Sequence, residues 1–141
     1  MKKLIITVFI AIALAASVKA QVQAQPKGQA VKPALISPKA ARDLLASNKD
    51  ALLIDVRTLE EFIAGRIAGS VLLPYDQINA ASAAATIGPN KDRTIIVYCR
   101  SGRRSEIAAA TLASLGYRKV LDLGGIGSWT YGTISGQPKK P

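Results

Sequence analysis

The chain has 141 residues, of which 19 are basic and 9 acidic, and 49% of them are hydrophobic. It contains one cysteine and no histidine. These counts exclude an internal disulfide, a Cys-x-x-Cys redox or zinc site, and catalysis by Cys–His or Ser–His–Asp groups.

The first 20 residues have the pattern of a secretory signal peptide. A basic start, Met1–Lys3, precedes an apolar run over residues 4–18, and small residues allow cleavage after Ala20 or Ala24. A retained membrane anchor is the minor alternative, because a spanning helix needs about 20 apolar residues and this run is shorter. We expect a periplasmic or secreted protein without stable membrane insertion after cleavage, and a polar, flexible leader over residues 21–33.

Charge and the single thiol narrow the expected partners. Cleavage removes three lysines and lowers the net charge from +10 to +7, which favours anionic partners. We expect small anions and no nucleic acid, since three arginines share one short segment and aromatic residues do not interleave with the basic ones. A free thiol is unusual in an exported protein, so Cys99 requires a functional explanation.

The predicted elements of the first half alternate between helix and strand. Ser37 and Pro38 begin a helix whose residues 40–45 include an apolar face. The apolar run over residues 52–55 fits a buried parallel strand. Thr58 and Glu61 form a capping box that begins a second helix, which ends near Gly65.

The alternation continues in the middle of the chain. Residues 71–73 predict a strand that Pro74 ends. An alanine-rich stretch over residues 76–87 predicts a helix, and residues 88–93 form a cluster typical of turns.

The last three elements include the strongest strand of the chain, over residues 94–98, which are β-branched and aromatic. A helix over residues 105–115 ends at Gly116, and residues 119–123 predict a last strand. The pattern predicts an α/β domain with a mostly parallel sheet. Such sheets bind ligands beyond the carboxyl ends of their strands, and Cys99 lies directly after the strongest one.

The loop from Cys99 to Arg104 carries the candidate chemistry. A tight strand-to-helix loop directs backbone N–H groups inward and forms an anion-binding nest, for which Gly102 supplies backbone freedom. We expect the neighbouring arginines to lower the thiol pKa, so that a nucleophile forms without a histidine base. The predicted substrate-binding residues are Arg100, Ser101, Gly102, Arg103, Arg104 and Ser105.

This nest suits a sulfur anion. The thiolate would take the outer sulfur of a donor such as thiosulfate, form a persulfide on Cys99, and pass the sulfur to a thiophilic acceptor such as cyanide, a small thiol or a protein. An inert buried thiol and a solvated basic loop are the plain alternatives. A cysteine phosphatase is a further alternative, but its arginine lies six positions after the cysteine, where this chain has Ser105.

Several motifs together resemble a single-domain rhodanese. They cover about residues 35–130 and are Leu53–Arg57, Glu61–Phe62, Gly65–Ser70, Cys99–Ser105 and Gly124–Trp129. The resemblance implies a small α/β domain, here residues 34–132, with a central five-stranded parallel sheet and helices on both faces. A loose tail is expected over residues 133–141.

The resemblance also implies roles for individual residues. Cys99 matches the persulfide-forming cysteine of a thiosulfate sulfurtransferase that needs no metal or other cofactor. Asp55 and Arg57 are expected to support the site, with Arg57 pairing to Glu60 or Glu61. Arg66 departs from the family, which usually has histidine there. A non-catalytic binding or redox-sensing module remains the alternative, in which an exposed thiolate is oxidised.

Overall fold

The computed structural model describes residues 32–138. The predicted signal peptide and most of the predicted leader therefore lie outside the described residues. Within the part of the chain that is described, no helix is both long and apolar enough to cross a membrane.

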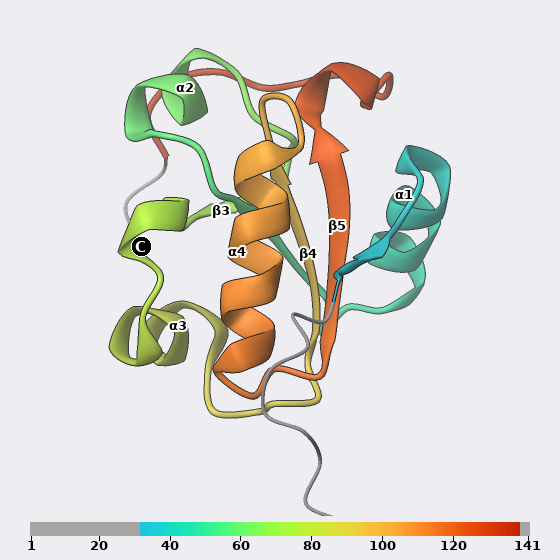
Figure 1. Ribbon diagram of the computed structural model, residues 1–141. Helices are drawn as coiled ribbons and strands as arrows, with labels where there is room; N and C mark the ends of the chain where they lie inside the picture. Colours follow the sequence, from blue (N-terminus) through green and yellow to red (C-terminus); the bar gives the residue numbers. More distant parts are fainter. Residues whose placement is uncertain (1–31, 139–141) are drawn as a thin grey trace, which may run out of the picture.

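Five parallel strands form one central sheet, which confirms the predicted α/β class (Figure 1). Their order is β1-β5-β4-β2-β3, so that β4 lies in the middle between β5 and β2. The strands are β1 (Ala34–Leu35), β2 (Leu52–Asp55), β3 (Val71–Leu72), β4 (Thr94–Cys99) and β5 (Lys119–Gly125).

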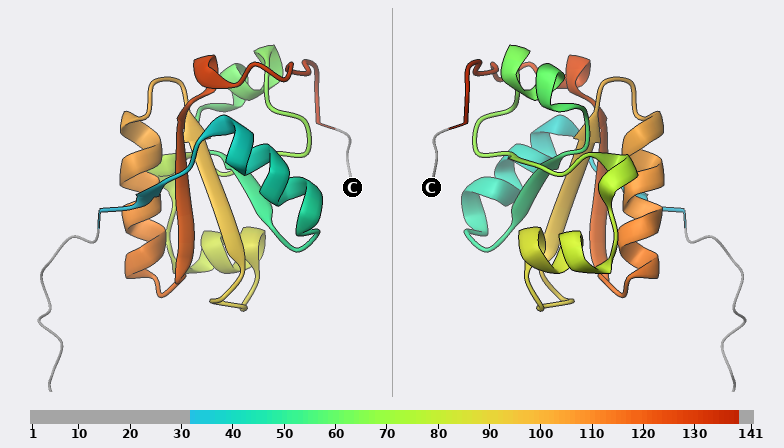
Figure 2. Two further views of the ribbon diagram at one scale, coloured as in Figure 1. Left: turned by 90° about the vertical axis from the view of Figure 1, so that its right-hand side faces the viewer. Right: turned by 90° about the vertical axis from the view of Figure 1, so that its left-hand side faces the viewer.

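Helices cover both faces of the sheet, as Figure 2 shows from two sides. Helices α3 and α4 pack on one face and α1 on the other, whereas α2 and η2 lie at the end of the sheet where the strands finish (Figure 1). The helices are α1 (Pro38–Ser47), α2 (Leu59–Ala64), η1 (Tyr75–Gln77), α3 (Ala80–Ile87), α4 (Arg103–Ser114) and η2 (Ile126–Ser128).

The central strand β4 divides the core into two clusters. Because successive side chains of a strand point to opposite faces, Ile95, Val97 and Cys99 join the cluster under α3 and α4. Ile96 and Tyr98 join the cluster under α1. All five residues are fully buried, so the thiol at the end of β4 is held in place by a rigid strand.

Local capping signals explain where the first two helices begin. The Ser37 hydroxyl accepts a hydrogen bond from the backbone N–H of Ala40, which confirms the predicted start of α1. Both hydrogen bonds of the predicted capping box at Thr58 and Glu61 are present in α2. The capping box thereby fixes the position of the Glu61 side chain at the start of α2.

The prediction of one helix over residues 76–87 was wrong at its start. Asn79 has an extended backbone and caps a shorter helix, α3, by accepting from the N–H groups of Ala81 and Ser82. Ser82 completes a second capping box with Asn79. These side-chain hydrogen bonds to the backbone compete with a continuous helix, so the preceding turn, η1, ends at Gln77.

Strand β1 was not predicted as an element of its own. It has two residues, too few for a periodic sequence pattern, and adds to β5 at the sheet edge. Helix α4 differs from its predicted bounds. Helix α4 begins at Arg103 instead of Ser105, because Gly102 takes a left-handed backbone with φ 101° and serves as its N-cap.

The segment expected to be a loose tail is partly bound to the domain. Ile134 and Arg66 exchange two backbone hydrogen bonds, of 2.8 and 2.9 Å, and the N–H of Gly136 donates to Ile63 O at 2.8 Å. Residues 134–136 thus pack against the loop that follows α2. Residues 139–141 lie outside the described part of the chain.

Candidate active site

The loop of interest joins the carboxyl end of β4 to the start of α4. Cys99 is the last residue of β4, and the N–H of Glu106 makes the first α-helical bond to Gly102 O. The backbone N–H groups of the first helical turn therefore have no partner within the helix and lie next to the loop. Cys99 was predicted to follow this strand directly, and the structure makes it the last residue of the strand.

The cysteine sulfur is bound within its own loop. The N–H of Gly102 donates to Cys99 Sγ over 3.0 Å. The protonated thiol can donate to Ser105 Oγ, 3.6 Å away, while that hydroxyl donates to Gly102 O at 2.9 Å. A thiolate has no proton to give, so on ionisation the Ser105 hydroxyl must turn toward the sulfur.

These contacts favour the charged form of the sulfur. Burial by itself raises the pKa of Cys99, but the Ser105 hydroxyl and the N–H groups of Ser105, Gly102 and Ser101 together hold it below its ordinary value. The loop therefore stabilises a negative sulfur through the Gly102 N–H, which already donates to it, and through the Ser105 hydroxyl beside it.

The thiol is more enclosed than the redox-sensing alternative requires. Cys99 is 0% exposed and belongs to the core cluster under α4. The exposed thiolate that this alternative assumes is therefore absent at Cys99, and the same enclosure applies to the approach of a sulfur donor. Hydrogen-bond donors around the sulfur also separate it from an inert core thiol, which has only apolar neighbours.

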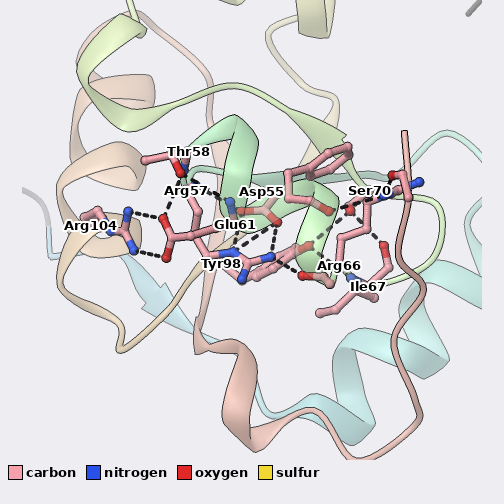
Figure 3. Close-up of polar contacts among 12 residues, drawn as sticks. Asp55, Arg57, Thr58, Glu61, Arg66, Ile67, Ser70, Tyr98 and Arg104 are labelled. Atoms are coloured by element: carbon pink, nitrogen blue, oxygen red, sulfur yellow. Dashed lines mark hydrogen bonds and ion pairs between the residues drawn. The ribbon is translucent and has the colours of Figure 1, made fainter. Parts of the chain in front are cut away.

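The three loop arginines do not gather around the sulfur as expected. Arg100 and Arg103 are exposed and lie on opposite sides of the loop. Arg104 turns to α2, where its guanidinium makes two hydrogen bonds, of 2.7 and 2.8 Å, to the carboxylate of Glu61 (Figure 3). Ser105 and backbone N–H groups are the groups that most lower the pKa of Cys99, whereas Arg104 interacts with the sulfur through charge alone.

The expected pair between Arg57 and Glu60 or Glu61 was also wrong. Arg57 binds Asp55 through both its Nε and its Nη2, the shortest distance being 2.7 Å, and donates to Gly65 O at 2.6 Å. Asp55 and Arg57 are only two positions apart at the end of β2, which brings them into contact. Glu61 instead forms an ion pair with Arg104. Asp55 and Arg57 therefore brace the turn between β2 and α2 from a buried position (Figure 3).

Tyr98 extends this network across the sheet. Its hydroxyl accepts from the N–H of Ile67 and lies 3.1 Å from Ser70 Oγ (Figure 3). Burial raises the pKa of Tyr98 to about 12, so it stays neutral at physiological pH. Asp55, Arg57 and Tyr98 are buried and together support the site from below.

A shallow cleft of about 460 Å³ adjoins the loop at Arg100, and sequence reasoning identified only some of its lining. Glu61 was assigned to helix capping, and Ile126 and Thr133 were not recognised as site residues. No local signal marks Thr133, because it enters the cleft only when the chain end folds back onto α2. The lining residues are Arg57, Glu61, Ala64, Gly65, Arg100, Ile126 and Thr133.

Arg66, which stands where the resemblance implies histidine, is buried at 8% exposure. Its guanidinium donates to the carbonyls of Gly136 and Phe62 at 2.7 and 3.2 Å and stacks over the Phe62 ring at 4.6 Å. The side chain thus ties the chain end to α2. Among residues 32–138, no group of three or more acidic, histidine or cysteine residues could hold a metal ion.

Comparison with known proteins places this geometry in a family. A family model for the rhodanese-like domain matches residues 37–131. A sulfurtransferase of Allochromatium vinosum is 42% identical over 86 residues, which are 60% of this chain and 77% of that protein.

Two further comparisons differ in extent. A probable adenylyltransferase/sulfurtransferase of Mycobacterium tuberculosis, MoeZ, is 37% identical over 107 residues, which are 75% of this chain but only 27% of that protein. A solved structure described as a rhodanese with anions from Escherichia coli is 30% identical with a TM-score of 0.55, covering 61% of this chain and 99% of the other. The chain belongs to the rhodanese-like family.

Proposed function

We propose that this member of the rhodanese-like family moves a sulfane sulfur from a small anionic donor to a thiophilic acceptor through a persulfide on Cys99. The observation that carries the proposal is the sulfur environment: a 3.0 Å hydrogen bond from Gly102 N–H, with Ser105 beside it, at the junction of β4 and α4. The sulfurtransferase names of the relatives support the same reaction class.

The first step forms the persulfide. The Cys99 thiolate attacks the outer sulfur of thiosulfate, a bond forms between the two sulfurs, and the bond to the sulfonate sulfur breaks. Sulfite leaves with the electron pair, and the negative charge moves to the outer sulfur of Cys99–S–S⁻. The N–H groups that lower the thiol pKa can donate hydrogen bonds to this charge as well, since it lies one atom further along.

The second step returns the enzyme to its starting state. An acceptor such as cyanide attacks the outer sulfur, thiocyanate forms, and the electron pair of the S–S bond returns to Cys99 as thiolate. A small thiol or a protein thiolate can take the place of cyanide in the same displacement. Two covalent half-reactions predict ping-pong kinetics. A phosphatase is disfavoured, because Ser105 stands where such an enzyme has its arginine, and the neighbouring Arg104 is bound to Glu61.

We also propose export to the periplasm or beyond, which rests on the signal pattern of residues 1–20 alone. Secretion of a chain that starts at Gln21 or Gln25, determined by N-terminal sequencing of the extracytoplasmic protein, is the expected result. A full-length chain in the cytoplasm would contradict it.

The sulfur-transfer proposal is tested with purified protein and a Cys99→Ser variant. Wild type mixed with thiosulfate should gain about 32 Da, one sulfur atom, and should release thiocyanate when cyanide follows. The variant should do neither. A folded wild type that alkylates at Cys99 but shows neither added mass nor thiocyanate would overturn thiosulfate as donor.

A further inference from the structure

Two hollows flank the Cys99 loop, and they differ in what surrounds them. The first, which we name the strap cleft, contains Arg100 and lies toward α2. The second, the β1 hollow, has about 420 Å³ and lies on the other side of the loop. Its lining residues are Lys32, Pro33, Leu35, Ser101, Gly102, Arg103, Glu106, Asp122 and Gly124.

Charge distinguishes the two hollows as routes for an anion. Two of the charged residues of the strap cleft are paired: Arg57 with Asp55, and Glu61 with Arg104 through both carboxylate oxygens. Arg100 therefore gives this cleft its net positive charge. The β1 hollow has two cations and two carboxylates, which balance each other. An anionic donor is therefore attracted more strongly to the strap cleft.

The far wall of the strap cleft is the chain end, residues 132–136, which we name the strap. In Figures 1 and 2 it runs from η2 across the finishing end of the sheet toward α2. Three backbone hydrogen bonds hold it: two between Ile134 and Arg66 and one from Gly136 to Ile63. Thr133 is thereby placed in the cleft wall, its hydroxyl 3.9 Å from where a Cβ on Gly65 would lie.

Arg66 fixes the strap from inside the protein. Burying a cation costs free energy unless hydrogen bonds satisfy it, and here the carbonyls of Gly136 and Phe62 do so. Its bond to Gly136 joins positions 70 residues apart, so the strap and α2 are held as one wall. Loss of the Arg66 guanidinium would leave the backbone bridge at Ile134 as the main tie.

We propose that sulfur donors reach Cys99 through the strap cleft, and that the strap, positioned by Arg66, limits the size of the group attached to the transferred sulfur. This inference rests on the proposed persulfide chemistry. A thiosulfonate such as benzenethiosulfonate reacts as thiosulfate does: the thiolate takes the outer sulfur, the S–S bond breaks, and the sulfinate leaves with the electron pair. Its phenyl group must fit where thiosulfate has only oxygen.

The test compares kcat/KM for benzenethiosulfonate with kcat/KM for thiosulfate. Thr133→Phe narrows the strap cleft from an exposed position, and we expect the ratio to fall about tenfold, mainly through KM for the larger donor. Leu35→Phe, at a residue 74% exposed, adds the same ring to the β1 hollow and should leave the ratio within about twofold. A fall with Leu35→Phe and none with Thr133→Phe would overturn the proposed route.

Loosening the strap should act in the opposite direction. We expect Arg66→Gln to raise the same ratio about fivefold, because the strap loses its tie at Gly136. Arg118→Gln removes a guanidinium at the opposite end of the sheet, where it pairs with Asp92, and should not change the ratio. Equal ratios in Arg66→Gln and wild type would contradict the positioning role.

Alkylation of Cys99 separates this inference from the sulfur chemistry. Thr133→Phe should slow a bulky naphthyl iodoacetamide about tenfold more than it slows iodoacetamide itself, whether or not sulfur is transferred. Unchanged alkylation in a wild type that forms the persulfide overturns the route and leaves the proposed function in place. Slowed alkylation in a protein that transfers no sulfur supports the route and overturns the function.

Discussion

At the scale of single residues, the sulfur of Cys99 is governed by short-range hydrogen bonds. The side chain is fully buried, a condition that normally disfavours a thiolate. Donors from its own loop and from Ser105 outweigh this cost and lower the pKa of the thiol. Among the causes that lower this pKa, the Ser105 hydroxyl comes first, so Ser105 is the residue to change first.

Replacing Ser105 with alanine should slow the alkylation of Cys99 at neutral pH. The variant removes one donor to the thiolate, so the pKa of Cys99 should rise and alkylation by iodoacetamide at pH 7 should fall about threefold. The measurement is the alkylation rate against pH, whose midpoint should move to higher pH. Ser114→Ala, on the same helix and exposed, is the matched control. An unshifted midpoint in Ser105→Ala would show that this hydroxyl does not stabilise the thiolate.

At the scale of elements, the loop keeps its shape because the end of β5 supports it. A Cβ on Gly125 would lie 2.7 Å from Arg100 O and 3.2 Å from the Cα of Ser101. Both atoms are backbone, so they cannot move aside without moving the loop. The close approach of these two segments requires glycine at position 125 even though its backbone φ, −88°, suits any residue.

Gly125→Ala should therefore damage the site while the fold persists. We expect sulfur transfer to fall at least about tenfold, since displacement of the loop by a few tenths of an ångström misplaces the donors to Cys99. Gly127→Ala is the matched control, because nothing lies within 4 Å of its added Cβ. Thiocyanate formation and circular dichroism measure the two effects. Equal activity of the two variants would contradict the supporting role of β5.

At the scale of the whole molecule, one ion pair links the start of α2 to the start of α4. Glu61 and Arg104 are 43 residues apart in sequence, and each side chain is about one quarter exposed. Hydrogen bonds from Arg104 lower the pKa of Glu61 to about 2 from its usual 4.5. A carboxyl group whose pKa is lowered on folding stabilises the protein above the unfolded pKa and loses this effect as pH falls through the folded one.

The stability of the protein should consequently decline between about pH 4.5 and pH 2, with this pair as one cause. Glu61→Gln should lower the free energy of unfolding at pH 7 by about 1 kcal/mol, a value reduced for partial exposure, and the difference from wild type should vanish near pH 2. Denaturant unfolding at several pH values measures it. Glu106→Gln, at an exposed position in α4, is the control; an equal loss there would contradict the assignment.

The sequence by itself determined the α/β class, the place of Cys99 at the end of the strongest strand, and the helix starts at Ser37 and Thr58. These features depend on residues within a few positions of one another, and their physics is local: alternation along a strand, hydrogen bonds in a cap, the fixed φ of proline. Asn79 shows the limit, because its competing cap outweighed an alanine-rich pattern that favours helix.

Only the tertiary structure decided which charges meet. Glu60 or Glu61 was the expected partner of Arg57, but Arg57 binds Asp55 at the turn after β2, and α4 brings Arg104 to Glu61. The strap is the extreme case, since Arg66 and Gly136 are separated by 70 residues. A long side chain in a sequence has many possible partners, and the free energy of each pairing depends on distances and burial that exist only once the sheet has brought the segments together.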